Sequence, residues 1–312
     1  MSETPDIDAI HEYFSTLQAS ICAQLEHLDG SQRFRGDEIA SPGGGVARPR
    51  VLEGGAHIEK AAVQFTHSVG VSLPPAATER NPQLAGHGFQ AVAISLIVHP
   101  RNPYAPTTHM NLRFFIVDAP QPTWYFGGGF DLTPYYGFVE DCVHWHQQSA
   151  NACTPFGAAL YAELKQACDE YFFLPHRQEP RGIGGIFFDD WTRGGFADSF
   201  AFVRSVGAHF LPAYSPILER RMHTAYGERE REFQLYRRGR YAEFNLAIDR
   251  GTRYGLQSGR RVESVLASLP PLASWRYDYR PDPGTPEAEL YERFLPPQRW
   301  VKVPTLVDKS GD

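Results

Sequence analysis

Histidine, asparagine and arginine alternate along one short stretch of this chain, at His109, Asn111 and Arg113. Residues two apart in a β-strand project from the same face, so these three side chains would form a polar row. A histidine can transfer a proton near neutral pH, and an arginine can bind a carboxylate through two parallel hydrogen bonds. Three glycines, at 127–129, precede Asp131 and permit sharp turning and close approach of a ligand. The set favours a site for an anionic ligand; the alternative is an exposed sheet face on which these side chains meet water.

Two predicted strands carry this polar row. Residues 88–99 and 109–117 both alternate with a period of two, and each has one strongly apolar face. Because both apolar faces should meet the same core, the two opposite faces must coincide, which adds Ser95 and His99 to the polar row. The proline-rich connection at 100–108 favours a stiff loop, so a long-looped hairpin is expected. Apolar neighbours on the polar face suit a large, flat ligand: Phe89, Ile97 and Phe115.

Helices must cover the sheet that this hairpin begins. An amphipathic helix is predicted over residues 7–28, where Thr4-Pro5-Asp6 supplies a cap, a pre-set first turn and a negative charge at the positive end of the dipole, and Gly30 is the expected stop. The Gly- and Pro-rich residues 36–56 are predicted to be a loop. Other expected strands are 123–126, 184–190, 241–249 and 275–279, and other expected helices are 138–150, 157–173 and 196–238, the last interrupted near Pro212 and Pro216. This order favours an α+β fold with one domain over residues 1–312 and an antiparallel sheet covered by helices.

Composition argues against several classes of partner. The 312 residues carry a formal net charge of −6, without the basic stripe that favours nucleic-acid binding. No apolar run is long enough to span a membrane, and the acidic start lacks the pattern of a secretion signal. The four cysteines form no CxxC pair and are expected to be free thiols. We therefore expect a cytoplasmic protein that binds no nucleic acid and inserts in no membrane.

Four sequence blocks resemble one enzyme family, in its order and spacing. The blocks are HPRNPYAPTTHMNLRFF at 99–115, GGGFDLTPYYGF at 127–138, HRQEPRGIGGIFFDD at 176–190 and RRGRYAEFNLAIDRGTRYGLQSGRRVESVLASLPP at 237–271. They resemble the oxygen-dependent coproporphyrinogen III oxidases. Four independent blocks make this similarity highly specific.

The resemblance implies an oxidoreductase of haem (porphyrin) biosynthesis. Its substrates would be coproporphyrinogen III and molecular oxygen. Oxidative decarboxylation of two propionates to vinyl groups would give protoporphyrinogen IX, carbon dioxide and hydrogen peroxide. No flavin, haem or nicotinamide cofactor is expected. The family fold is a large flat antiparallel sheet sandwiched between layers of helices, and the family assembles as a homodimer, here with segment 240–276 at the interface.

The resemblance also assigns roles to site residues. Arg113 would bind the reacting propionate, His109 would donate a proton, and Asp131 would face the pyrrole nitrogens as a base or hydrogen-bond acceptor. These three are the expected catalytic residues. Further substrate contacts are expected at Ser95, Asn111, Leu112, Gly259, Arg260 and Arg261.

Four histidines match positions treated as ligands of a divalent metal in this family: His99, His109, His146 and His176. Imidazole is a common ligand for such metals, and the alternative is that these rings bind substrate carboxylates. Two rival hypotheses stay open. One is a non-haem metal oxygenase with a facial triad of His99, His109 and Asp131, and the other is a tetrapyrrole carrier without catalysis.

Overall fold

Seven antiparallel strands form the centre of the structure, in the order β1-β2-β3-β4-β5-β6-β9. The computed structural model describes residues 4–41, 43–72, 86–119, 123–257 and 261–302. Six strands follow one another in chain order, and β9 joins β6 only after two intervening helices. The strands are β1 Ile39–Ser41, β2 Gly45–Glu53, β3 Ile58–Gly70, β4 Gly88–Pro100, β5 Thr107–Asp118, β6 Thr123–Thr133 and β9 Gly184–Trp191, with a separate short pair, β7 Phe173–Leu174 and β8 Glu179–Pro180.

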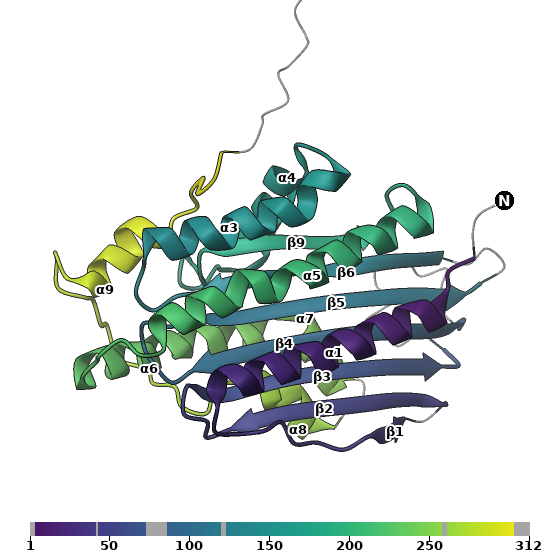
Figure 1. The fold of residues 1–312 in the computed structure, drawn as a ribbon, viewed down its shortest axis with the longest axis horizontal. Helices are drawn as coiled ribbons and strands as arrows, with labels where there is room; N and C mark the ends of the chain where they lie inside the picture. The colour runs from purple at the N-terminus through teal and green to yellow at the C-terminus, as the bar shows by residue number, and fades with distance from the viewer. Residues whose placement is uncertain (1–3, 42, 73–85, 120–122, 258–260, 303–312) are drawn as a thin grey trace, which may run out of the picture.

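Helices cover both faces of this sheet. Figure 1 shows α1, α3 and α5 in front of the strands and α6, α7 and α8 behind them. The predicted α+β fold, an antiparallel sheet packed against helices, is therefore confirmed. The helices are α1 Ile7–Asp29, α3 Val139–Cys153, α4 Leu160–Tyr171, α5 Gly195–Arg221, α6 Glu228–Glu243, α7 Arg250–Gln257, α8 Val262–Val265 and α9 Pro286–Glu289, with short 3₁₀ turns at Thr154–Phe156 and Leu266–Ser268 and π-helical turns at Phe244–Ile248 and Leu290–Phe294.

The first helix forms as its sequence predicts. The Asp6 side chain accepts a hydrogen bond from the backbone N–H of Ala9, and Gly30 ends the helix in the left-handed region, at φ 70°. Its apolar stripe lies against the front face of β3 and β4, where Phe14 and Val63 are fully buried in one core cluster. This layer makes the front face of the sheet a dry core.

The hairpin of β4 and β5 has the register that its two patterns require. Ser95 lies opposite Asn111, and Ile97 lies opposite His109. The two apolar faces meet in the front core, where Leu96 and Leu112 are buried. The polar faces of the two strands therefore coincide on the rear side, as predicted.

Two sequence expectations near the edges of the sheet were wrong. Residues 36–56 are not a loop throughout, since they contain β1 and β2, and β2 pairs with β3 from Val46 to Glu53. Most of β2 is half-buried, so its alternation is weak and pairing with a neighbouring strand outweighs its composition. The segment 123–126 is likewise only the start of β6, which continues straight through the three glycines to Thr133.

Three expectations in the second half of the chain were also wrong. Residues 241–249 are not a strand but the end of α6 and a π-helical turn. Residues 275–279 form no strand. The helix α5 runs without interruption through Pro212 and Pro216. Packing against the sheet supports these helical segments although their local preferences are poor.

Candidate active site

The rear face of the sheet carries the three predicted catalytic residues together with Ser95 and Asn111. On β5, His109, Asn111 and Arg113 alternate, as expected. They lie opposite Asp131, Gly129 and Gly127 of β6, respectively. Gly127 and Gly129 have no side chains, so the backbone of β6 is uncovered next to Arg113 and Asn111.

A histidine and a carboxylate form a pair at one end of this row. The Nδ1 atom of His109 lies 3.0 Å from Oδ1 of Asp131. Both oxygens of that carboxylate also accept hydrogen bonds from Nη2 of Arg181, at 2.8 and 2.7 Å. The Asp131 and Arg181 side chains are almost fully buried, whereas the His109 side chain keeps 23% of its surface exposed. His109 is thus the solvent-accessible member of a hydrogen-bonded chain whose other members, Asp131 and Arg181, are buried.

The pKa of Asp131 is lowered in this environment. Burial alone would raise it, but the charges of Arg181 and His109 and their hydrogen bonds outweigh that effect. Asp131 is therefore an ionised group with both oxygens occupied. Ionised and buried, it suits orientation of the His109 ring better than the ligand-facing role that the resemblance implied.

Arg181 was not recognised as a functional residue from the sequence. Its guanidinium lies over three aromatic rings, 4.1 Å from the centroid of Phe172 and 4.6 Å from those of Tyr241 and Phe244. Cation–π contacts of this kind stabilise a desolvated cation. Arg181 lies within the 176–190 block, but no local pattern marks it as the partner of Asp131.

A second charged cluster lies at the other end of the row. Arg113 donates from Nη1 to Oδ1 of Asn111, at 3.0 Å, and from Nη2 to Oδ1 of Asp189, at 2.6 Å. To reach Asp189 on β9, the Arg113 side chain passes over Gly127 of β6. A Cβ atom on that glycine would lie 2.6–2.8 Å from guanidinium atoms of Arg113. The Arg113 side chain can therefore take this path only over a residue without a side chain.

Asp189 and Arg250 complete the second cluster, and the sequence patterns assigned neither to the site. Oδ2 of Asp189 accepts a hydrogen bond from Nη2 of Arg250 at 2.9 Å. Arg250 is held at the start of α7, where Asp249 accepts a hydrogen bond from the N–H of Thr252 at 2.7 Å and another from the hydroxyl of Tyr171 at 3.0 Å. Burial would raise the pKa of Asp189, but Arg113 and Arg250 lower it overall.

The remaining substrate-binding predictions have mixed placements. Ser95 and Asn111 are half-buried and adjacent on the rear face. Leu112 is fully buried in the front core, so its side chain does not reach the rear face, because successive strand residues alternate sides. Gly259 and Arg260 lie outside the described residues. Arg261 is exposed and pairs with Glu263 at 3.3 Å.

The four histidines expected to bind a metal do not fit a common ligand set. Both ring nitrogens of His99 are occupied, by the Thr107 hydroxyl at 3.1 Å and the Ser268 carbonyl at 2.9 Å. Both nitrogens of His146 are occupied too, by the Tyr161 hydroxyl at 2.9 Å and the Ile183 carbonyl at 3.1 Å. A metal would have to displace these partners, because a ligating nitrogen needs its lone pair free.

The other two histidines have carboxylate partners. His176 contacts Glu243 through Nε2 at 2.9 Å, and His109 contacts Asp131. Across the described parts of the chain, no group of three or more His, Cys, Asp or Glu side chains is placed to hold a metal ion. The facial triad of the rival hypothesis does not form either, since His99 and Asp131 are saturated by protein partners.

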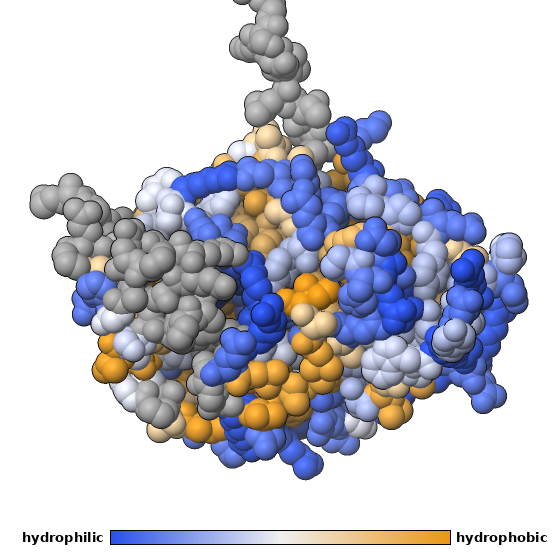
Figure 2. Space-filling model, turned by 180° about the vertical axis from the view of Figure 1, so that it is seen from behind, coloured by the Kyte–Doolittle hydropathy of each residue, from blue (hydrophilic) through white to orange (hydrophobic). Residues whose placement is uncertain are grey.

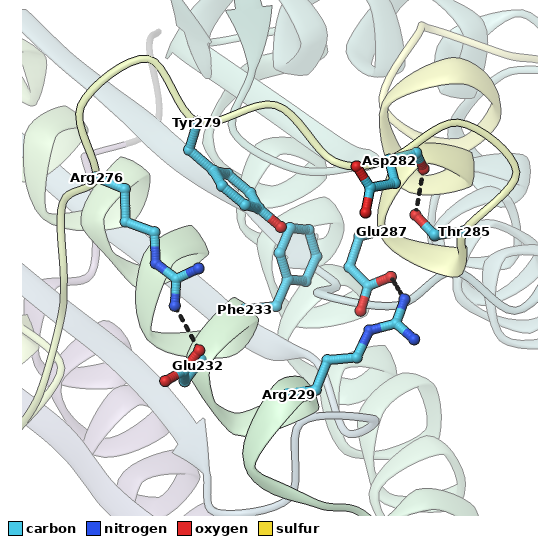
Figure 3. Close-up of a pocket in the computed structure, with 8 residues that line it drawn as sticks. All are labelled: Arg229, Glu232, Phe233, Arg276, Tyr279, Asp282, Thr285 and Glu287. Atoms are coloured by element: carbon cyan, nitrogen blue, oxygen red, sulfur yellow. Dashed lines mark hydrogen bonds and ion pairs between the residues drawn. The ribbon is translucent and has the colours of Figure 1, made fainter.

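A separate hollow of about 320 Å³ lies away from the rear-face row. Figure 3 shows it between α6 and the chain from Arg276 to Glu287, with Phe233 and Tyr279 between two ion pairs. Arg276 binds Glu232 at 2.6 Å and Arg229 binds Glu287 at 2.5 Å. Among the residues that the structure describes, no predicted site residue lines this hollow, and its arginines already have partners, so we do not assign it to the reaction.

Over the described residues, no helix has the length and apolar character of a membrane span.

Comparison with known families agrees with the four sequence blocks. A family model described as coproporphyrinogen III oxidase matches residues 9–300, which include all four.

Proposed function

The chain belongs to the coproporphyrinogen III oxidase family, and we propose that the rear-face row from His109 to Asp189 is the place where it carries out that family's reaction. The reaction is the oxidative decarboxylation of coproporphyrinogen III to protoporphyrinogen IX in haem biosynthesis, with O₂ as co-substrate. One observation carries the assignment: two partly exposed arginines converge on Asp189 at one end of the row, and a histidine that a buried carboxylate orients lies at the other end.

Arg113 and Arg250 are the proposed propionate ligands. Each guanidinium has several N–H donors in a planar fork that matches a carboxylate. Their side chains are 31% and 43% exposed, so an entering ligand can reach both. Ser95 and Asn111 lie next to Arg113 on the same face and supply further polar contacts.

His109 is the proposed proton donor. Because Asp131 is ionised, it accepts a hydrogen bond from the Nδ1–H of His109, which leaves Nε2 to exchange a proton with the reacting groups. For one propionate, the balanced step consumes the carboxylate, O₂ and one proton and yields a vinyl group, CO₂ and H₂O₂. The proton from His109 therefore enters the peroxide, while the two electrons come from the substrate itself.

The proposed function has a direct test. The purified protein would be treated with chelator, mixed anaerobically with coproporphyrinogen III and then exposed to oxygen, while protoporphyrinogen, CO₂ and peroxide are followed. We expect two CO₂ per tetrapyrrole. Binding of substrate without turnover under any condition would favour a carrier instead. Activity that returns only with added Mn, Fe or Mg would require a metal site that the described residues do not form.

The assignment of Arg113 has its own test. Arg113→Ala removes a guanidinium from the proposed propionate site, and we expect kcat/KM to fall by about a hundredfold or more. Arg193→Ala is a matched control, because Arg193 is mostly exposed and forms its ion pair with Glu163 at the surface. Near-normal turnover by Arg113→Ala would contradict its role.

We also propose that the protein forms a homodimer through segment 240–276. Figure 2 shows the rear of the molecule, where hydrophobic patches interrupt a largely hydrophilic surface. Large apolar side chains are exposed along this segment: Leu246, Leu256, Val262, Leu272 and Trp275. Exposed apolar groups of this kind are typical of association surfaces. Sedimentation should show a dimer at micromolar concentration, and Leu256→Glu with Val262→Glu should give a monomer; a monomeric native protein would contradict this proposal.

A cytoplasmic location is likewise a proposal. It is supported by four buried cysteines without a disulfide among them. Cell fractionation with the tagged full-length chain would test it.

A further inference from the structure

Asp189 binds two arginines in the way that a substrate carboxylate would. One of its oxygens accepts from Arg113 at 2.6 Å and the other from Arg250 at 2.9 Å. These arginines reach it from β5 and α7, which are far apart in the sequence. The carboxylate of Asp189 therefore lies between the same two guanidiniums that the proposed function gives to the propionate.

A bulge in β9 places this carboxylate. Gly128 pairs with Phe188, whereas Phe126 pairs with Trp191, so two residues of β9 lie opposite Gly127 alone. The extra residue, Asp190, has a left-handed backbone at φ 49°, and its N–H donates to Oδ1 of Asp189 at 3.1 Å. The bulge directs the Asp189 side chain toward Gly127 of β6, where the Arg113 guanidinium lies.

We propose that Asp189 is a displaceable counter-ion, which binds Arg113 and Arg250 when the site is empty and yields them to the reacting propionate of the substrate. This inference rests on the proposed function of the two arginines. Asp189 would then be a positioning residue, since it acts on the substrate only through the arginines.

The exposure of the three side chains supports an exchange of partners. Arg113, Asp189 and Arg250 keep 31%, 21% and 43% of their surface, respectively. A sealed ion pair would be strongly destabilised if one partner left, whereas a partly solvated one is compensated by water and by the incoming carboxylate. The buried pair of Asp131 and Arg181, in contrast, is built to stay closed.

The charge balance of the reaction gives this exchange a use. Decarboxylation converts a propionate anion into a neutral vinyl group, so one negative charge leaves the site with each decarboxylation. Two adjacent guanidiniums would then face each other without a counter-ion. Return of Asp189 neutralises them, and it favours departure of the vinyl-bearing ring over its retention.

The test uses the stable porphyrin coproporphyrin III, which keeps the four propionates but does not react as the porphyrinogen does. Asp189→Asn removes the competing charge, and we expect this variant to bind the porphyrin about tenfold more tightly than the native protein, as measured by fluorescence titration. Asp190→Asn is the matched control, because it removes the same charge one residue away, and asparagine tolerates a left-handed backbone. Its affinity should stay within about twofold. Equal or weaker binding by Asp189→Asn would overturn the proposal.

A small carboxylate provides a second measurement that needs no turnover. In Asp189→Asn, millimolar sodium propionate should bind between the arginines and raise the melting temperature by several degrees, whereas Asp190→Asn should show no such gain over sodium chloride. Absence of this rescue would count against a carboxylate site. If Asp189→Asn does not fold, the charge-balanced double variant Asp189→Asn with Arg250→Gln replaces it, and it should bind coproporphyrin III more tightly than Arg250→Gln alone. The two proposals can fail separately. If the native protein does not turn over coproporphyrinogen III but sodium propionate still stabilises Asp189→Asn, the proposed function is rejected and the role of Asp189 as a counter-ion stands.

Discussion

The guanidinium of Arg113 lies across Gly127 and reaches Asp189 on the far side of it. Gly127→Ala would place a methyl group within 2.6–2.8 Å of guanidinium atoms. Since the φ angle of Gly127 is not in the left-handed region, alanine fits its backbone, and the arginine must move instead. We expect a well-folded variant whose kcat/KM is about ten- to a hundredfold lower, measured by steady-state assay of coproporphyrinogen III.

A neighbouring strand offers the control for this substitution. At Gly88 of β4 an added Cβ would come no closer than 3.4 Å to another atom, which is ordinary contact. Gly88→Ala should retain native activity. If both glycine variants were equally active, the passage of Arg113 over Gly127 would have no role in the reaction.

Removal of the proposed proton donor should affect turnover more than binding. His109→Asn keeps a polar side chain beside Asp131 but cannot supply a proton at neutral pH. We expect kcat to fall by about 10²–10⁴-fold with a small change in KM, as general acid catalysis requires. The exposed His27, substituted in the same way, serves as the control. A larger effect on KM than on kcat would assign His109 to binding instead.

The buried pair of Arg181 and Asp131 should matter for folding. Arg181→Gln leaves the Asp131 charge in an apolar surrounding, and we expect the free energy of unfolding to drop by about 3–5 kcal/mol. Urea denaturation followed by circular dichroism measures this loss. Arg193→Ala, which breaks a surface pair, should cost less than about 1 kcal/mol. Similar losses in the two variants would mean that the pair at the site is not structural.

The buried histidine His146 should make the free energy of unfolding depend on pH in the mildly acidic range. Burial, with the charge of Lys165, lowers the pKa of His146 from 6.5 to about 3. Below pH 6.5 the unfolded chain therefore binds a proton at this histidine that the folded protein does not bind. The contribution of His146 to stability is fully present above pH 6.5 and is lost as the pH falls toward 3. The loss approaches about 1.4 kcal/mol per pH unit for one such group.

In the variant His146→Gln, the free energy of unfolding should change less steeply with pH between pH 6 and 4.5. The difference in slope should correspond to about one proton, which is about 1.4 kcal/mol per pH unit. That range lies above the window of carboxylates such as Glu243, whose pKa is lowered from 4.5 to about 2, chiefly through Arg177 and His176 against the opposing effect of burial. Chemical denaturation at several pH values measures the slope. An unchanged slope would show that His146 is already protonated or exposed in the native protein.

The hairpin could be predicted from sequence because its information is local. The period of two in β4 and β5 fixes which side chains share a face, and one register then follows from the shared core. This is why the amino-acid pattern alone groups Ser95, Asn111 and Arg113 correctly. The same rule, applied strictly, would also have excluded the side chain of Leu112 from the rear face.

The rest of the site depends on contacts that no local pattern encodes. Arg250 reaches the site only because a π-helical turn and the cap at Asp249 start α7 behind the sheet. Arg181 meets Asp131 only after β9 has docked beside β6. The GGG segment looked like a turn because glycine usually marks one, but here it is a strand whose missing side chains make room for Arg113.

The late position of β9 has a consequence for how the protein becomes active. Strands β1 to β6 pair with their neighbours in chain order, whereas β9 must wait for α3 and α4 and then close a long loop onto β6. Closing such a loop is slow compared with forming hairpins. A refolding chain would therefore acquire most of its sheet while Asp131 still lacks Arg181, so the orientation of His109, and enzymatic competence with it, would appear only after β9 has docked.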